Sequence, residues 1–151
     1  MILTSLREFL QTVPSQTRLM GLDIGTKRIG IAFSDPQGTI AFPRETYERQ
    51  NMRKDLGVLG RMCREENVQG IVMGLPLSLN NEEEENCQII RTFADKLYAR
   101  TTLPMLLMDE RMSTAAVTRV MKDAGVKRQE RHTHDDKLAA CYILQTVLDA
   151  R

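Results

Sequence analysis

The chain has 151 residues, of which 42% are hydrophobic and 27% charged, and its formal net charge is +1. This length suits one domain with an ordinary core, and the composition excludes an intrinsically disordered chain. No overall basic field attracts nucleic acid, although an enzyme with its own acidic site can act on nucleic acid and still be neutral in sum. No apolar run approaches the roughly 18 residues of a membrane span, so we expect a cytoplasmic protein without a membrane partner.

The N-terminal stretch MILTSLREFLQTVPSQT, residues 1–17, is expected to be a short extension that forms an amphipathic helix closed by Pro14. It contains charges and no cleavage-type site, so we do not interpret it as a signal peptide. Residues 18–151 are predicted to form one domain, because no repeat or low-complexity linker divides them. The cysteines are widely spaced and form no CxxC pair, so free thiols are expected at Cys63, Cys87 and Cys141.

Three strands are expected at the start of this domain. Leu19–Ile24 has the apolar character of a buried strand, and Arg28–Ser34 alternates and is rich in Ile and Phe. The sequence Asp35-Pro-Gln-Gly has the composition of a turn, so a third strand, from about residue 39 to 47, should pair back on the second.

Helices and short buried strands alternate in the rest of the chain. Apolar residues at helical spacing from Met52 to Cys63 predict a helix, and a buried strand follows at 70–74. Asn81, with Glu84 three residues later, resembles a capping box that begins a second helix before another buried strand at 104–108. Two more helices are then expected, at about residues 113–125 and 135–148.

This order predicts an α/β fold. The sheet should be five-stranded and mixed, with its first three strands antiparallel and helices on both faces. The strands at 19–24, 70–74 and 104–108 should be parallel, and in such sheets the chemistry gathers beyond the carboxyl ends of the strands. Those ends carry Asp23, the sequence Gly74-Leu75-Pro76 and the sequence Asp109-Glu110-Arg111.

Asp136, near the start of the last predicted helix, shares one helical face with Ala140, Ile143 and Leu144. The small residues at 139 and 140 would let this helix approach the sheet closely. Asp136 is therefore expected near the strand ends, although a helix-start aspartate stabilised by the helix dipole is a common alternative.

Three acids, Asp23, Glu110 and Asp136, are thus candidates for one site. Each alone has an ordinary explanation as a turn residue, a strand end or a helix cap. Together they would repel one another unless a cation intervenes, and hard oxygen ligands favour Mg²⁺ or Mn²⁺. A site with two such ions would activate water and stabilise the leaving oxygen at a phosphodiester.

Three basic residues lie beside these acids in the sequence. Lys27 and Arg28 follow the first strand, and Arg111 follows Glu110. All three are candidates to bind substrate phosphates. A structural ion pair with Asp109 or Glu110 is an equally good interpretation of Arg111.

Four ordered motifs, GLDIGTKRIGIAFSD, GLPL, DERMST and DKLAA, resemble those of the YqgF/RuvX family, and the resemblance covers about residues 18–148. Members are described as Holliday junction resolvases and as nucleases that mature precursor small-subunit ribosomal RNA. The resemblance implies a ribonuclease H-like fold and metal-dependent hydrolysis of nucleic-acid phosphodiesters. It also implies that Asp23, Glu110 and Asp136 are the catalytic, metal-binding acids.

The segment after GLPL departs from the family pattern. The family usually has a glycine-containing loop there, whereas this chain has SLNNEEEEN from Ser78 to Asn86. An acidic loop should repel phosphates, which places substrate contacts on that side in question.

Other functions stay open on the sequence alone. The DIGT motif also resembles the first phosphate loop of sugar kinases and actin-like ATPases, but those proteins close two such domains around a nucleotide. A non-catalytic RNA-binding or ribosome-associated factor would fit the near-neutral charge. The sequence does not decide between RNA and branched DNA as substrate, and a resolvase would be expected to form a homodimer.

Overall fold

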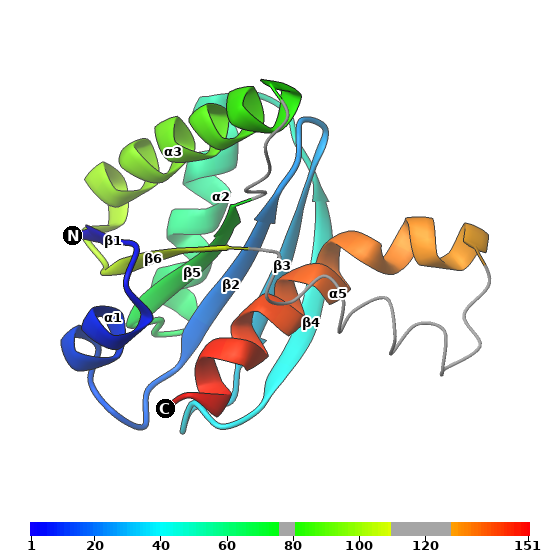
Figure 1. Cartoon of the computed structure of the whole chain (residues 1–151). Helices are drawn as coiled ribbons and strands as arrows, with labels where there is room; N and C mark the ends of the chain where they lie inside the picture. Colours follow the sequence, from blue (N-terminus) through cyan, green and yellow to red (C-terminus); the bar gives the residue numbers. More distant parts are fainter. Residues whose placement is uncertain (76–80, 110–127) are drawn as a thin grey trace.

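The structure of the protein is a computed structural model that describes residues 1–75, 81–109 and 128–151, with the backbone alone described at 81–84 and 128–135. Over these residues the chain forms one mixed sheet with helices on both faces (Figure 1). All five strands predicted from the sequence, at about residues 19–24, 28–34, 39–47, 70–74 and 104–108, are present.

The described part of the chain contains a six-stranded sheet in the order β1-β6-β5-β2-β3-β4. Parallel pairing joins β1 to β6, β6 to β5 and β5 to β2, and antiparallel pairing joins β2 to β3 and β3 to β4. The strands are β1 (Ile2–Leu3), β2 (Leu19–Ile24), β3 (Arg28–Ser34), β4 (Ala41–Glu48), β5 (Gly70–Leu75) and β6 (Met105–Asp109).

The predicted count of five strands is therefore wrong by one. The additional strand is β1, whose Ile2 and Leu3 pair in parallel with Met105 and Leu106 along the free edge of β6. Such a short strand blunts the edge of the sheet. Two residues are too few to carry a periodicity, which is why the sequence pattern does not predict it.

Helices α2 (Met52–Glu65) and α3 (Asn81–Thr101) cover one face of the sheet, and α1 (Leu6–Thr12) and α5 (Arg128–Asp149) cover the other (Figure 1). Each face has its own hydrophobic core. The first core centres on residues such as Ile31, Leu59 and Phe93, and the second on residues such as Leu19, Val72 and Leu144. The alternation of apolar side chains along the strands supplies both cores from one sheet.

The N-terminal segment packs onto the second core. Helix α1 lies where the sequence predicts a short helix, and Ser5 caps it by accepting a hydrogen bond from Glu8 N. The side chain of Phe9 is fully buried. The division into an extension at 1–17 and a nuclease domain at 18–151 stays a prediction.

Helix α5 begins at Arg128, seven residues before the predicted start. Asp136 consequently lies in the interior of the helix and not in its first turn. The field of the helix dipole falls off within the first turn, so the explanation of Asp136 as a dipole-stabilised helix start is wrong.

Two findings agree with the composition. None of the described helices combines the length and the apolar character that crossing a membrane requires. The three cysteines are free thiols, and burial raises the pKa of Cys63 to about 12, which leaves that thiol protonated and unreactive at neutral pH.

Candidate active site

Asp23 is the second-last residue of β2, at the carboxyl end of the strand. Its neighbours in the strand are buried, whereas Asp23 itself is half-buried. Successive side chains of a strand point to opposite faces, so Asp23 lies on the same face as Gly21. Gly21 is in contact with the backbone of Ala140 in α5. The Asp23 carboxylate therefore lies on the face that α5 covers.

Gly30 brings Asp136 to this place. It is the residue of β3 that pairs directly with Asp23. A Cβ atom at Gly30 would lie 1.8 Å from the carbonyl oxygen of Asp136, so only glycine lets the α5 backbone come this close. Gly30, the β3 residue opposite Asp23, is thus the point where the α5 backbone contacts the sheet at Asp136. The close approach of α5 that residues 139 and 140 predict is present.

Arg28 pairs with one of the two acids, Asp136. It opens β3 on the same face as Gly30, and its Nε lies 3.5 Å from Oδ2 of Asp136. Both side chains are about one-third exposed, so this ion pair contributes little to stability. A weak, accessible pair of this kind can exchange Asp136 for a substrate phosphate at small cost.

Lys27 has different surroundings. It is exposed in the turn between β2 and β3, and it lines a cavity of about 530 Å³ together with Thr26, Arg49 and Asn51. Among the described residues Lys27 makes no ion pair. The structure thus places Asp23, Arg28 and Asp136 on the α5 face, with Arg28 and Asp136 in contact, and places Lys27 on the lining of a cavity.

Glu110 and Arg111 lie outside the described residues. Asp109, the residue before them, is the last of β6 and pairs with Leu75 at the carboxyl end of β5. Residues 78–80 of the acidic segment and the helix expected at 113–125 also lie outside the described part of the chain. The assignments of Glu110 and Arg111 stay predictions.

The donor set fits a hard divalent cation. Asp23 and Asp136 offer carboxylate oxygens, which are the ligands that Mg²⁺ and Mn²⁺ prefer. Within residues 1–75, 81–109 and 128–151 no group of three His, Cys, Asp or Glu side chains is arranged to hold a metal ion. The third acid of the predicted set, Glu110, lies outside these residues, so the fit to a metal ion concerns Asp23 and Asp136.

A further polar cluster, not predicted from the sequence, lies at the carboxyl end of the sheet. Asp55 is fully buried and accepts hydrogen bonds from Tyr47 Oη, Arg49 Nε and Gln50 N. Arg49 also donates from Nη1 to the carbonyl oxygen of Gly25, two residues after Asp23. A signal exists in the sequence, because Asp55 falls within the apolar stripe of α2, beside Leu56 and one turn before Leu59.

A family model described as RuvX, Holliday junction resolvase, matches residues 17–150. A protein of Ehrlichia chaffeensis is 44% identical over 149 residues, which cover 99% of this chain and 96% of the relative. A protein of Zymomonas mobilis is 44% identical over 145 residues, which cover 96% of this chain and 88% of the relative. Both relatives carry the name pre-16S rRNA nuclease as a provisional assignment.

Two solved structures share the fold. RuvC of T. thermophilus, in complex with a Holliday junction substrate, has a TM-score of 0.55 at 12% identity, covering 89% of this chain and 95% of that one. The fowlpox virus Holliday junction resolvase has a TM-score of 0.51 at 12% identity, covering 89% and 100%. At these identities the likeness concerns the fold alone, and it confirms the predicted ribonuclease H-like class.

Proposed function

The chain belongs to the RuvX family, whose model is described as Holliday junction resolvase, and on this premise we propose that it is a metal-dependent nuclease acting on nucleic-acid phosphodiesters. The observation that carries the proposal is that Asp23 and Asp136 both lie at Gly30 on one face of the sheet. Two carboxylates from β2 and α5 lie on one face of the sheet because Gly30 lets the helix backbone touch the strand between them. Arg28 offsets the charge of Asp136, and the carboxylate oxygens of the two acids are ligands that Mg²⁺ and Mn²⁺ prefer.

In this proposal Asp23, Asp136 and Glu110 would hold two Mg²⁺ or Mn²⁺ ions, because a phosphodiester has an attacking and a leaving oxygen to stabilise. When bound, the metal supplies an activated water and neutralises charge that develops on the phosphate. The protein's own residues orient the substrate. Arg28 exchanges its contact with Asp136 for a phosphate oxygen, and Lys27 and Arg111 attract the neighbouring phosphates.

We assign precursor small-subunit ribosomal RNA as the substrate, because relatives that are 44% identical over nearly the whole chain carry that assignment. The enzyme would then work in the cytoplasm. Branched DNA is the second candidate, since the family model is described as a Holliday junction resolvase. A resolvase cuts two strands symmetrically and requires a homodimer, whereas an RNA-processing nuclease can act as a monomer.

Cleavage assays with purified protein test the proposal. The protein is incubated with Mg²⁺ or Mn²⁺ on precursor ribosomal RNA and on four-way DNA junctions, alongside Asp23→Asn and Asp136→Asn. Each substitution should reduce cleavage by about a hundredfold or more, because changing even the residues that support metal ligands costs 10–100-fold. Asp149→Asn is the matched control, since Asp149 is an exposed acid on the same helix that bonds only to Gln145 among the described residues.

Each other outcome has a defined meaning. Cleavage that survives in both active-site variants would remove the two-acid site. Binding of RNA by the wild type without cleavage would favour a non-catalytic RNA or ribosome factor. ATP turnover without nuclease activity would favour a sugar-kinase-like or actin-like phosphate-binding protein. Cleavage of junctions alone, by a species that sediments as a dimer, would favour the resolvase.

A further inference from the structure

The turn from Gly25 to Arg28 joins the strand of Asp23 to the strand of Arg28 and carries Lys27. Within the turn, Gly25 N donates to the Arg28 carbonyl oxygen at 2.9 Å. The β2–β3 pairing fixes the backbone of Asp23 opposite Gly30. The last pair of this ladder is Ile24 with Ile29. Arg28 is held as well, because it pairs with Glu48 of β4. Lys27, at the exposed tip of the turn, therefore needs another support if it is to keep a fixed position.

Arg49 provides contacts at both ends of this turn. Its Nη1 donates to the Gly25 carbonyl oxygen at 3.0 Å, and its backbone N donates to the Lys27 carbonyl oxygen at 2.8 Å. Its guanidinium carbon lies 5.2 Å from the centre of the Phe93 ring, within the range of a cation–π contact. One residue from the end of β4 thus spans the turn.

Asp55 fixes the guanidinium from the other side. Its Oδ2 accepts the Arg49 Nε bond at 3.0 Å, while Oδ1 accepts from Tyr47 Oη at 2.9 Å and from Gln50 N at 3.0 Å. A fully buried carboxylate is stable only with such partners, and losing one of them costs far more than it does on the surface. The orientation of Arg49 is therefore set by the core of the protein and not by the turn that it holds.

We propose that Arg49, oriented by Asp55, is a positioning residue that fixes the Gly25–Arg28 turn and, through it, the substrate contact of Lys27. This inference rests on the proposed nuclease function where it concerns substrate, and on geometry alone where it concerns the turn. Arg49 touches no reacting atom. Because the β2–β3 ladder holds Asp23 independently, Arg49 acts on substrate affinity more than on the chemical step.

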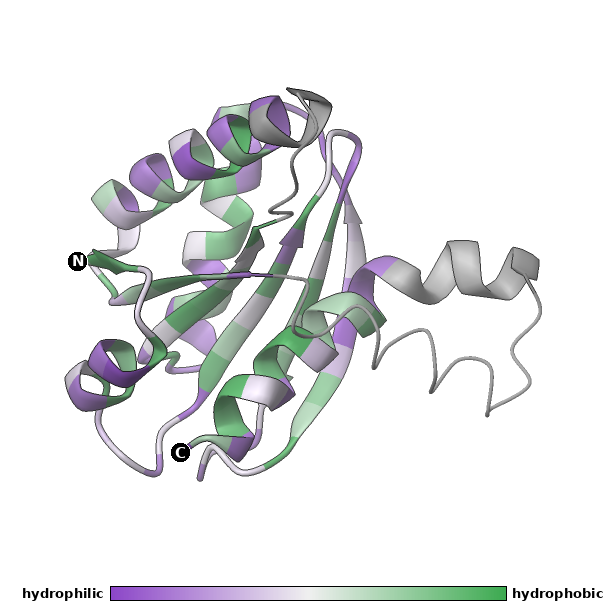
Figure 2. Ribbon diagram, viewed as in Figure 1, coloured by the Kyte–Doolittle hydropathy of each residue, from purple (hydrophilic) through white to green (hydrophobic). Residues whose placement is uncertain are grey.

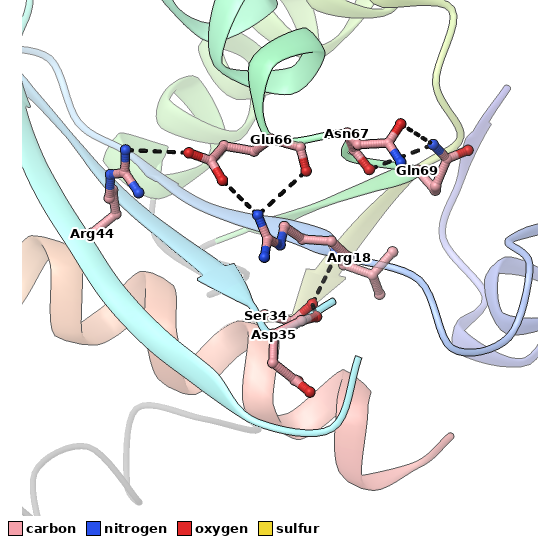
Figure 3. Close-up of polar contacts among 8 residues, drawn as sticks. Arg18, Ser34, Asp35, Arg44, Glu66, Asn67 and Gln69 are labelled. Carbon is pink, nitrogen blue, oxygen red and sulfur yellow. Dashed lines mark hydrogen bonds and ion pairs between the residues drawn. The ribbon is translucent and has the colours of Figure 1, made fainter. Parts of the chain in front are cut away.

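The contacts of Arg49 with Gly25, Lys27 and Asp55 form a clamp on the turn, and two variants disrupt it in different ways. Arg49→Lys keeps the positive charge but lacks the planar fork that reaches Asp55 and Gly25 at once. Asp55→Asn keeps one oxygen for Tyr47 and Gln50 N but turns an amide nitrogen toward Arg49. The matched control is Arg44→Lys, since Arg44 of β4 also lies over a phenylalanine, 5.4 Å from the Phe33 ring, and pairs with a carboxylate of the α2 end, Glu66 (Figure 3).

Hydrogen exchange of the Gly25 amide, measured without metal or substrate, tests the turn. Exchange should be roughly tenfold or more faster in Arg49→Lys and Asp55→Asn, corresponding to about 1.4 kcal/mol of lost local stability, and unchanged in Arg44→Lys. Unchanged exchange in either released variant that stays folded would overturn the clamp. Because two variants are used, unfolding of one leaves the other to decide.

Steady-state cleavage kinetics test the consequence for substrate. KM should rise roughly tenfold in both released variants while kcat stays within about threefold of the wild type. A role in folding alone would lower kcat by reducing the folded fraction and leave KM unchanged, and that result would overturn the positioning role. If the wild type cuts neither substrate, the proposed function fails, whereas faster Gly25 exchange in the released variants would still support the clamp.

Discussion

The two ends of the sheet carry the same combination of side chains in different surroundings. At the carboxyl end Arg49, just after β4, pairs with Asp55 of α2 at 3.0 Å over the Phe93 ring. At the amino end Arg44, within β4, pairs with Glu66 at the end of α2 at 3.3 Å over the Phe33 ring (Figure 3). The Asp55 side chain is 1% exposed and the Glu66 side chain 25% exposed.

This difference in exposure separates an anchored contact from an adaptable one. Glu66 is shared between Arg44 and Arg18, and water can replace either partner. Asp55 has no access to water, so its three donors must stay in place. The buried pair can therefore transmit a fixed position to the turn beside Asp23, whereas the more accessible Glu66 joins Arg18, before β2, to Arg44, within β4. Figure 2 shows the general pattern, with hydrophobic residues along the strands and hydrophilic residues recurring along the helices.

The largest effect is expected from Asp55→Ala. Removing the carboxylate leaves the mostly buried Arg49 and two further donors without an acceptor, which should lower the free energy of unfolding by about 3–5 kcal/mol. Urea-induced unfolding followed by circular dichroism measures this loss. A loss below about 1 kcal/mol would mean that the two ends of the sheet are energetically equivalent.

The backbone of α5 also comes very close to the sheet at the carboxyl end, and Gly30→Ala addresses that contact. The added methyl group would overlap the Asp136 carbonyl, so α5 must shift, at a cost of about 2 kcal/mol or more. The same urea experiment measures it. In the control Gly57→Ala the methyl group would lie 3.5 Å from Arg100 Nη2, an ordinary contact, and this helical position should gain up to about 1 kcal/mol. Equal effects at the two glycines would show that α5 does not depend on Gly30.

Acid should remove the contribution of the buried Asp55–Arg49 pair to the free energy of unfolding. Burial raises the pKa of Asp55, but hydrogen bonds from Gln50 N, Arg49 and Tyr47 outweigh it and leave the pKa below its ordinary value. Such a carboxyl stabilises the fold fully above its unfolded-state pKa, about 4, and loses this contribution as the pH falls through the folded-state pKa. The stability difference between wild type and Asp55→Asn should thus be constant from pH 7 to 5 and shrink below pH 4. Urea midpoints across this range measure it, and a difference that grows in acid would contradict the assignment.

The smallest effect is expected from Glu66→Ala at the amino end. An accessible pair of this kind contributes about 0–1 kcal/mol, and 1 M NaCl should abolish even that because the Debye length falls to about 3 Å. Unfolding at low and high salt measures it. A salt-insensitive loss as large as that of Asp55→Ala would remove the distinction between the two ends.

Much of the carboxyl end could be predicted from sequence because it depends on local patterns. Short apolar runs mark the parallel strands, and their ends locate Asp23. The apolar stripe from Ala140 to Leu144 locates Asp136 on the inner face of its helix. The seven residues of α5 before Asp135 contain no apolar residue, so periodicity could not find the beginning of the helix.

The positioning contacts could not be predicted, because they join residues far apart in the chain. The bond from Arg49 to Gly25 spans 24 positions, and no local pattern records it. The importance of Gly30 depends on how near a helix from the other end of the chain comes. The predicted contributions of Glu110 and Arg111 concern residues outside the described ranges and stay predictions.

The pairing of Ile2 with Met105 has a consequence for synthesis on the ribosome. Translation adds about 5–20 residues per second, so roughly 5–20 s pass between the appearance of β1 and that of its partner β6. During that interval Ile2 and Leu3 have no strand to pair with. The edge of the sheet therefore closes late in biogenesis, and the earliest residues of the chain are among the last to reach their final positions.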